Sequence, residues 1–93
     1  MKIMILLADG FEEVEFVTIV DILRRADLEA TVVGLKAGPI DGSHGVKIMP
    51  DTLVDKVPAD QFDAVVLPGG YPGFVNLGED ERVLKLVRDM ASC

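Results

Sequence analysis

The sequence predicts part of a doubly wound α/β sheet, and three observations support this class. Short apolar runs at residues 2–7, 30–35 and 64–67 are typical of parallel strands that are buried on both faces. Two longer segments, one after the first run and one after the last, have the acidic starts and apolar faces of helices. Glycine turns join strand to helix in both places, which gives the βα units from which such sheets are built.

The first strand is expected over Lys2 to Leu7, in a central position, because this run is continuously apolar. Ala8-Asp9-Gly10 forms the turn, and a helix begins at Glu12 or Glu13, whose carboxylates suit the positive end of the helix dipole. The helix runs to about Ala26. Its narrow polar stripe consists of Glu15, Thr18, Asp21 and Arg25. Because apolar residues cover most of the remaining circumference, we expect a second contact for this helix, such as a homodimer interface.

The middle of the chain is expected to complete a right-handed β-α-β crossover. The second strand is expected over Glu29 to Leu35. Residues 36–46 form a glycine-rich loop or a small β excursion, and residues 46–49 form a short edge strand that Pro50 stops. Residues 51–61 are polar and irregular, with one helical turn.

The stretch from Asp63 to Gly73 is the part around which the chain is organised. Its strand, Ala64 to Leu67, is broken abruptly by Pro68-Gly69-Gly70, and the last helix is expected from about Glu79 to Ala91. Open α/β sheets bind their ligands at the carboxyl ends of the strands. The pair Gly69-Gly70 is therefore the first functional candidate.

Length, charge and cysteine content limit the possible functions. With 93 residues the chain forms one small domain, and its net charge of −7 makes nucleic acid and anionic membranes unsuitable partners. The apolar run from Ile3 to Ala8 is too short for a signal sequence or a membrane span. A single cysteine allows no internal disulfide, so a cytoplasmic protein is the default expectation.

The end of the sequence indicates an incomplete domain. A parallel strand as apolar as Ala64 to Leu67 should not lie on an exposed edge, and no strand follows the last helix. We therefore expect residues 1–93 to be the N-terminal half of a single α/β domain. The strand at 64–67 would then pair with the missing C-terminal half or with another copy of the chain.

Four segments, in this order, carry a family resemblance: Ala8 to Glu15, Asp21 to Ala26, Val65 to Gly70, and Asn76-Leu77. Through them nearly the whole chain resembles the ThiJ/PfpI superfamily, also called the DJ-one family. The resemblance implies a flavodoxin-like fold of the class I glutamine amidotransferase-like type, usually as a dimer, with a cysteine-dependent site. Family activities include glyoxalase and deglycase chemistry on reactive carbonyls, intracellular peptidase activity, and chaperone or oxidative-stress roles.

The resemblance also assigns roles to three residues. Glu15 matches the family glutamate that hydrogen-bonds the reactive cysteine, where a protonated carboxyl can hold the thiolate or shuttle its proton. Gly69 and Gly70 match residues whose backbone amides help to bind an oxyanion beside that cysteine. From the sequence alone, the alternatives are a solvated acid at the start of a helix and a plain turn.

Three further residues are candidates of lower rank. Cys93 follows a helix directly, with no strand and turn to lift it into a site, so we interpret it as a loop residue and not as the nucleophile. His44 lies alone in a glycine-containing loop, and a surface histidine is the expectation, with no metal site. Arg25 corresponds to an arginine of an anion-binding patch in some relatives, and a surface ion pair with Asp21 is the equal alternative.

The resemblance therefore implies half of a cysteine-dependent protein that acts on reactive carbonyls or amides, with the half that bears the nucleophile absent. The chain alone is expected to be inactive, and no cofactor is expected. One alternative is a non-catalytic module of the same fold with a stress-response, redox-sensing or chaperone-like role. Another is a flavin-binding flavodoxin, which is disfavoured because no Ser/Thr-rich phosphate loop follows the first strand.

Overall fold

A four-stranded parallel sheet with helices on both faces forms the body of the chain in the computed structural model, which describes residues 1–91. The main sheet has the order β5-β2-β1-β6, and a separate pair, β3 and β4, is antiparallel. The elements are β1 (Lys2–Leu7), α1 (Glu13–Arg25), β2 (Glu29–Gly34), β3 (Ile40–Asp41), β4 (Lys47–Ile48), β5 (Thr52–Leu53), β6 (Ala64–Val66), α2 (Gly73–Gly78) and α3 (Glu81–Ala91). Two 3-10 turns, Val54–Lys56 and Ala59–Gln61, precede β6.

The first strand is the centre of the sheet. β1 pairs with β2 over its whole length and with β6 at Ile3, Met4 and Ile5. Five of its six residues are buried, as expected for a parallel strand covered on both faces. β2, β1 and β6 are adjacent in that order, so the first βα crossover moves the chain to one side of β1 and the later one returns it to the other side.

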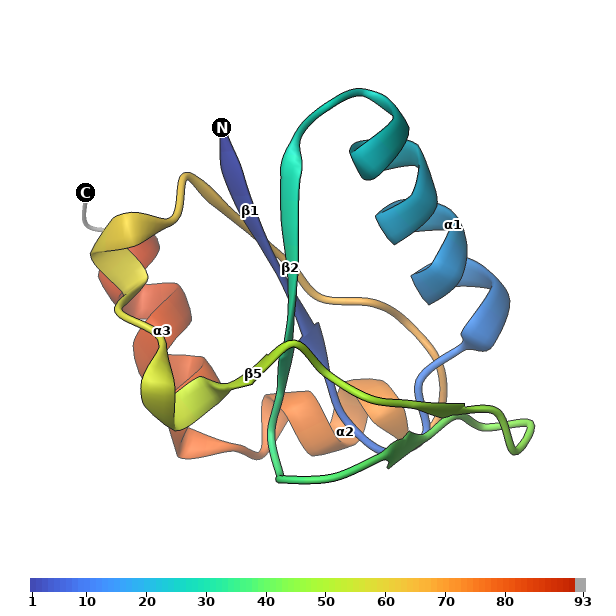
Figure 1. Cartoon of the computed structure of the whole chain (residues 1–93). Coiled ribbons are helices and arrows are strands. Elements are labelled where there is room, and N and C mark those ends of the chain that lie inside the picture. The colour runs from blue at the N-terminus through green and yellow to red at the C-terminus, as the bar shows by residue number, and fades with distance from the viewer. Residues whose placement is uncertain (92–93) are drawn as a thin grey trace.

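Alternation along β1 divides the core into two layers. The side chains of Ile3, Ile5 and Leu7 pack with Phe11 and Phe16 on the face that α1 covers. Those of Met4, Leu6 and Ala8 pack on the other face with apolar residues of α2 and α3, namely Leu77, Val83 and Leu86. Figure 1 shows this arrangement, with α1 on one side of the strands and α3 on the other.

Several boundaries differ from those expected. β2 ends at Gly34 and β6 at Val66, each one residue early. The last helix begins at Glu81 instead of Glu79, because the Asp80 side chain accepts a hydrogen bond from the backbone N–H of Arg82 at 2.9 Å and so caps the helix. Helix α2 was not predicted, and the segment 51–61 holds β5 and two 3-10 turns.

The position of β6 agrees with the expectation of an incomplete domain. Within residues 1–91 this strand lies at the edge of the sheet, and its apolar sequence is typical of a strand that is covered by a further neighbour. Its three residues are half-buried, and Leu67, just after it, is 48% exposed. The short strand expected at 46–49 is β4, which pairs with β3 and not with the main sheet. None of the helices in the described part of the chain combines the length and apolar character needed to cross a bilayer.

Candidate functional site

Two βα turns meet backbone to backbone at the carboxyl edge of the sheet. The turn after β1 carries Gly10 and Glu12, the turn after β6 carries Gly69, and Gly73 begins α2 directly after that turn. The N–H of Glu12 donates to the carbonyl of Gly69 at 3.0 Å, and the N–H of Gly73 donates to the carbonyl of Gly10 at 3.1 Å. The Asn76 side chain adds a hydrogen bond of 2.7 Å to the carbonyl of Asp9. The two turns therefore form one rigid unit.

Glycine is required in this unit because the backbones of the two turns lie too close together to leave room for a side chain. Gly70 has a φ of +108°, and a Cβ there would lie 2.8 Å from the carbonyl oxygen of Gly10. A Cβ at Gly73 would also lie 2.8 Å from that oxygen. Because these neighbours are backbone atoms, they cannot rotate away as a side chain would. The Gly69-Gly70 turn is thus held at a fixed position relative to the start of α1.

Glu15 lies beside this turn. Its Oε1 accepts a hydrogen bond from the N–H of Gly69 at 3.3 Å, and its side chain is otherwise exposed. The contact follows from the topology, because β1 and β6 are neighbours and both turns leave the same edge of the sheet. Gly70 contributes its carbonyl to the N–H of Phe74 at 2.9 Å. The structure therefore brings Glu15 and Gly69 together, while the chemical roles of Glu15, Gly69 and Gly70 stay predictions.

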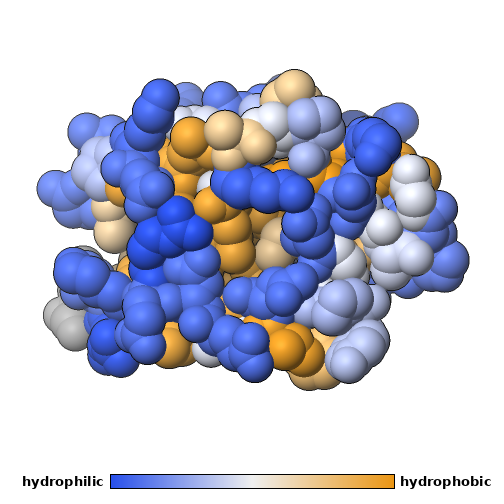
Figure 2. Space-filling view, turned by 90° about the horizontal axis from the view of Figure 1, so that it is seen from below, coloured by the Kyte–Doolittle hydropathy of each residue, from blue (hydrophilic) through white to orange (hydrophobic). Residues whose placement is uncertain are grey.

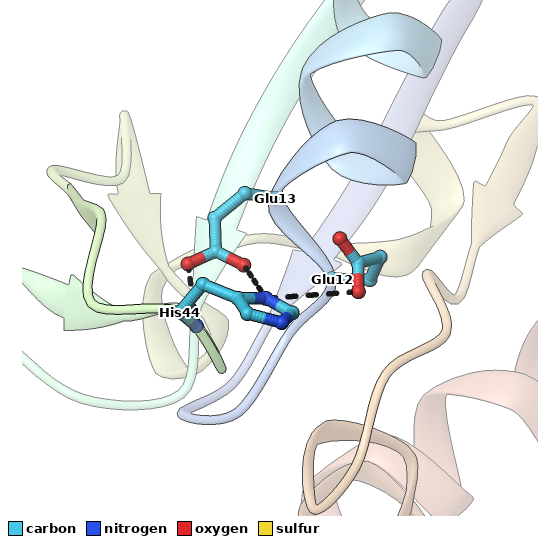
Figure 3. A group of neighbouring side chains, drawn as sticks. All are labelled: Glu12, Glu13 and His44. Atoms are coloured by element: carbon cyan, nitrogen blue, oxygen red, sulfur yellow. Dashed lines mark hydrogen bonds and ion pairs between the residues drawn. The ribbon is translucent and has the colours of Figure 1, made fainter.

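A second group of side chains, which the sequence did not predict, lies at the start of α1. It consists of Glu12, Glu13 and His44, and Figure 3 shows the His44 ring beside both carboxylates. Glu13 is buried, and its Oε2 accepts from the backbone N–H groups of His44 at 2.7 Å and Val46 at 3.2 Å. Its Oε1 lies 3.3 Å from the Ser43 hydroxyl and 3.1 Å from Nδ1 of His44.

These contacts fix the ionisation of Glu13. Burial favours the neutral acid, but hydrogen bonds from backbone N–H groups and with the His44 ring outweigh it and lower the pKa of Glu13 to about 2. Glu13 is therefore a carboxylate at neutral pH that anchors the loop between β3 and β4. No local pattern in the sequence indicates this contact, because Glu13 and His44 are 31 residues apart and the loop must fold back onto α1.

The other candidate residues have simpler surroundings. The side chain of His44 is 72% exposed, in agreement with a surface histidine, although its backbone is held by Glu13. Arg25 forms an exposed ion pair with Asp21 at 2.9 Å, which was one of the two alternatives for it. Cys93 lies outside the described residues.

Apolar surface flanks the site on two sides. A groove of about 380 Å³ lies between the end of β6, α2 and α3, and its lining includes Leu67, Phe74, Leu84 and Val87. A second groove, of about 400 Å³, lies between α1 and the segment after β4, and its lining includes Val17, Val20 and Met49. Figure 2 looks onto the carboxyl edge of the sheet, where hydrophobic side chains are visible between hydrophilic ones.

Comparison with known proteins places the chain in a family. A model of the DJ-1/PfpI family matches residues 1–93. The chain is 44% identical to protein dj-1beta of Drosophila melanogaster over 90 residues, which cover 96% of this chain and 48% of that protein. It is 41% identical to a deglycase of Thermococcus kodakarensis over 80 residues, or 85% of this chain and 48% of the deglycase. The chain thus spans about half the length of these relatives.

Solved structures agree with this comparison. The crystal structure of Drosophila melanogaster DJ-1beta has a TM-score of 0.93 and 43% identity, and the match covers 98% of this chain and 50% of that one. Oxidized Toxoplasma gondii DJ-1 also has a TM-score of 0.93, with 28% identity and the same coverage of both chains. The parallel sheet with flanking helices is therefore the DJ-1/PfpI fold as far as the match extends. From its sequence and its fold, the chain belongs to the DJ-1/PfpI family.

Proposed function

We propose that this chain supplies one half of a cysteine-dependent active site that acts on reactive carbonyls or on amides. Glu15 would be the carboxyl partner of a cysteine on the other half, and the amides of Gly69 and Gly70 would bind the oxyanion. The observation that carries the proposal is the 3.3 Å hydrogen bond between the N–H of Gly69 and Oε1 of Glu15.

The geometry suits this chemistry in two ways. The N–H of Gly69 points at an oxygen that bears negative charge when Glu15 is ionised, so the same donor can serve an oxyanion formed from a substrate. The carboxyl group is exposed, so it is accessible to a thiol that approaches from solvent or from a second polypeptide segment. A protonated carboxyl can donate to a thiolate and keep the cysteine reactive.

The substrate class in this proposal is supported by the names of relatives of this chain. Deglycases of Thermococcus kodakarensis and Pyrococcus abyssi are 41% and 38% identical to it. In both deglycation and glyoxalase reactions the substrate has an electrophilic carbonyl carbon. A thiolate attacks this carbon, and negative charge develops on the carbonyl oxygen. Peptidase activity on amides uses the same arrangement and is the second substrate class of the proposal.

Two apolar surfaces define the partners in this proposal. The groove between β6, α2 and α3 would receive the remainder of the α/β domain. The chain matches only about half the length of its relatives, and the remainder is the part of their domain that it does not match. The exposed face of α1, which includes Val14 and Val17, would form a homodimer interface. A cytoplasmic location is part of the same proposal.

A chimera tests the proposal directly. Residues 1–93 would replace the matching half of the Pyrococcus abyssi deglycase, with which they align over 93 residues at 38% identity. We expect the purified chimera to consume methylglyoxal and Glu15→Gln to lower kcat at least tenfold. The matched control is Glu79→Gln, an exposed glutamate at the end of α2, which should leave kcat unchanged. Equal activity of the chimera and its Glu15→Gln variant would refute the role of Glu15, and a folded but inactive chimera would favour a non-catalytic module.

A further inference from the structure

The group Glu12, Glu13 and His44 has the donors and the spacing of a metal site. One ring nitrogen of His44 and one carboxylate oxygen of each glutamate all lie within 4.8 Å of one another. Nδ1 is 3.1 Å from Oε1 of Glu13 and 3.9 Å from Oε2 of Glu12. Two ligands of a tetrahedral zinc ion, each at about 2.1 Å from the metal, are about 3.4 Å apart. The observed distances lie on either side of that value.

Each carboxylate is oriented by a bond to the backbone. Oε2 of Glu13 is held by the N–H groups of His44 and Val46, so its Oε1 faces the imidazole. Oε1 of Glu12 lies 3.4 Å from the N–H of Val14, so its Oε2 faces the same ring. In each carboxylate, one oxygen is held by a backbone N–H, and this contact directs the second oxygen toward the ring (Figure 3). Such outer contacts orient the ligands of metal sites.

The donor set selects among metal ions. One imidazole nitrogen with two carboxylate oxygens suits zinc and similar first-row ions, whereas magnesium and calcium prefer oxygen ligands alone. The ring is 72% exposed, so an ion can enter from solvent and keep water in its remaining positions. The start of α1 disfavours a cation through the helix dipole, and the two negative carboxylates oppose that effect.

We propose that Glu12, Glu13 and His44 form a binding site for one divalent first-row transition-metal ion of the zinc type. The site joins the start of α1 to the loop between β3 and β4. It stands apart from the proposed active-site residues, because it uses none of Glu15, Gly69 and Gly70. The two proposals can therefore fail separately.

Titration with cobalt(II), followed by visible absorption, tests the site in the full chain. The Cys93→Ser background removes the only thiol, and His44 is the only histidine, so any imidazole ligation must come from His44. We expect one ion to bind per chain, with intense absorption from a tetrahedral site, and zinc to displace it. The imidazole signals of His44 in NMR spectra should shift or broaden in the same titration.

Variants decide whether His44 and Glu12 are ligands of the ion. His44→Gln and Glu12→Gln should each weaken cobalt binding at least tenfold, while Glu79→Gln, which removes the same charge elsewhere, should leave it unchanged. Glu12→Gln should keep the fold, because the amide oxygen of the new side chain can still accept a hydrogen bond from the N–H of Val14. Cobalt affinity that is equal in wild type and His44→Gln would overturn the proposal, as would weak, non-saturating binding with no change in the His44 signals.

Discussion

The N–H of Gly69 and the carboxylate of Glu15, 54 residues apart in the sequence, meet at 3.3 Å across the carboxyl edge of the sheet. The contact depends on the central position of β1, which pairs with β6 at Ile5 and Val66 and so aligns the two turns that follow. Because the turns are bonded backbone to backbone, the distance is set by the sheet and not by flexible side chains alone. A side chain added at Gly69 should therefore displace the Glu15 carboxylate before it disturbs any other residue.

The variant Gly69→Ala separates the site from the fold. A Cβ at this position would lie 2.9 Å from Oε1 of Glu15, and the exposed carboxylate can move away at little cost. We expect the free energy of unfolding to fall by less than about 1 kcal/mol, while kcat of the chimera falls at least tenfold. Combining the change with Glu15→Gln should cost no more activity than the larger single effect. Full additivity of the two losses would show that Gly69 and Glu15 act independently.

The variant Gly70→Ala should instead damage the fold. Gly70 has a φ of +108°, and its Cβ would meet the backbone of Gly10 and of Phe11 at 2.8 Å. Conformational strain and the clash together should lower the free energy of unfolding by roughly 2–4 kcal/mol, measured with urea. Gly45→Ala is the control, since Gly45 has a φ of +87° with no atom within 4 Å, and should cost about 1–2 kcal/mol. Equal losses at the two positions would contradict the close packing of the turns.

The sequence carried enough information for the central strand, for α1 and for the pairing of Glu15 with Gly69. A continuous apolar run and a glycine turn are local patterns, and the crossover rule converts them into neighbouring strands. Helix α2 could not be predicted in this way. It begins and ends in glycine, and the contacts that fix it are the bonds from Gly73 and Asn76 to the turn after β1. The bond between Glu13 and His44 was missed for the same reason, since it exists only once the loop packs on α1.

Acid should remove the stabilisation that Asp80 provides. Its pKa lies below the ordinary value because the Arg82 side chain donates to it, although burial acts in the opposite direction. A carboxyl whose pKa is lowered by folding stabilises the fold above its unfolded pKa of about 3.8, and this contribution is lost as pH falls through the lower, folded pKa. Asp80→Asn should therefore cost about 1–3 kcal/mol at pH 6 and clearly less near pH 3.

The measurement is denaturant unfolding of wild type and Asp80→Asn at both pH values. Asparagine still accepts the bond from the N–H of Arg82 that caps α3, so the comparison isolates the charge. Asp21→Asn, which breaks the exposed pair with Arg25, should cost less than about 1 kcal/mol at either pH. A loss for Asp80→Asn that is the same at pH 3 and pH 6 would exclude the charged contact as its cause.

The apolar groove beside β6 predicts association of this chain. Phe74 is 57% and Leu67 48% exposed there, and burying one such side chain is worth about 1.5–3 kcal/mol. β6 also lies at the edge of the sheet in the described part of the chain, where an added strand could pair with it. We expect the purified chain to form a complex with a second copy or with a polypeptide that carries the other half of the domain, and Phe74→Asp to weaken that complex at least tenfold.

Size-exclusion chromatography with light scattering distinguishes the groove beside β6 from the exposed face of α1. The runs cover a range of concentrations, with and without the second half of the Pyrococcus abyssi deglycase. Phe74→Asp should weaken binding of that half at least tenfold, because an aspartate cannot be buried in the groove without a large desolvation cost. Val17→Asp, on the exposed face of α1, should leave that binding intact and impair only dimerisation. A wild-type chain that stays a cooperatively folded monomer of 10.0 kDa at micromolar concentration and binds no added half would show that the groove needs no partner.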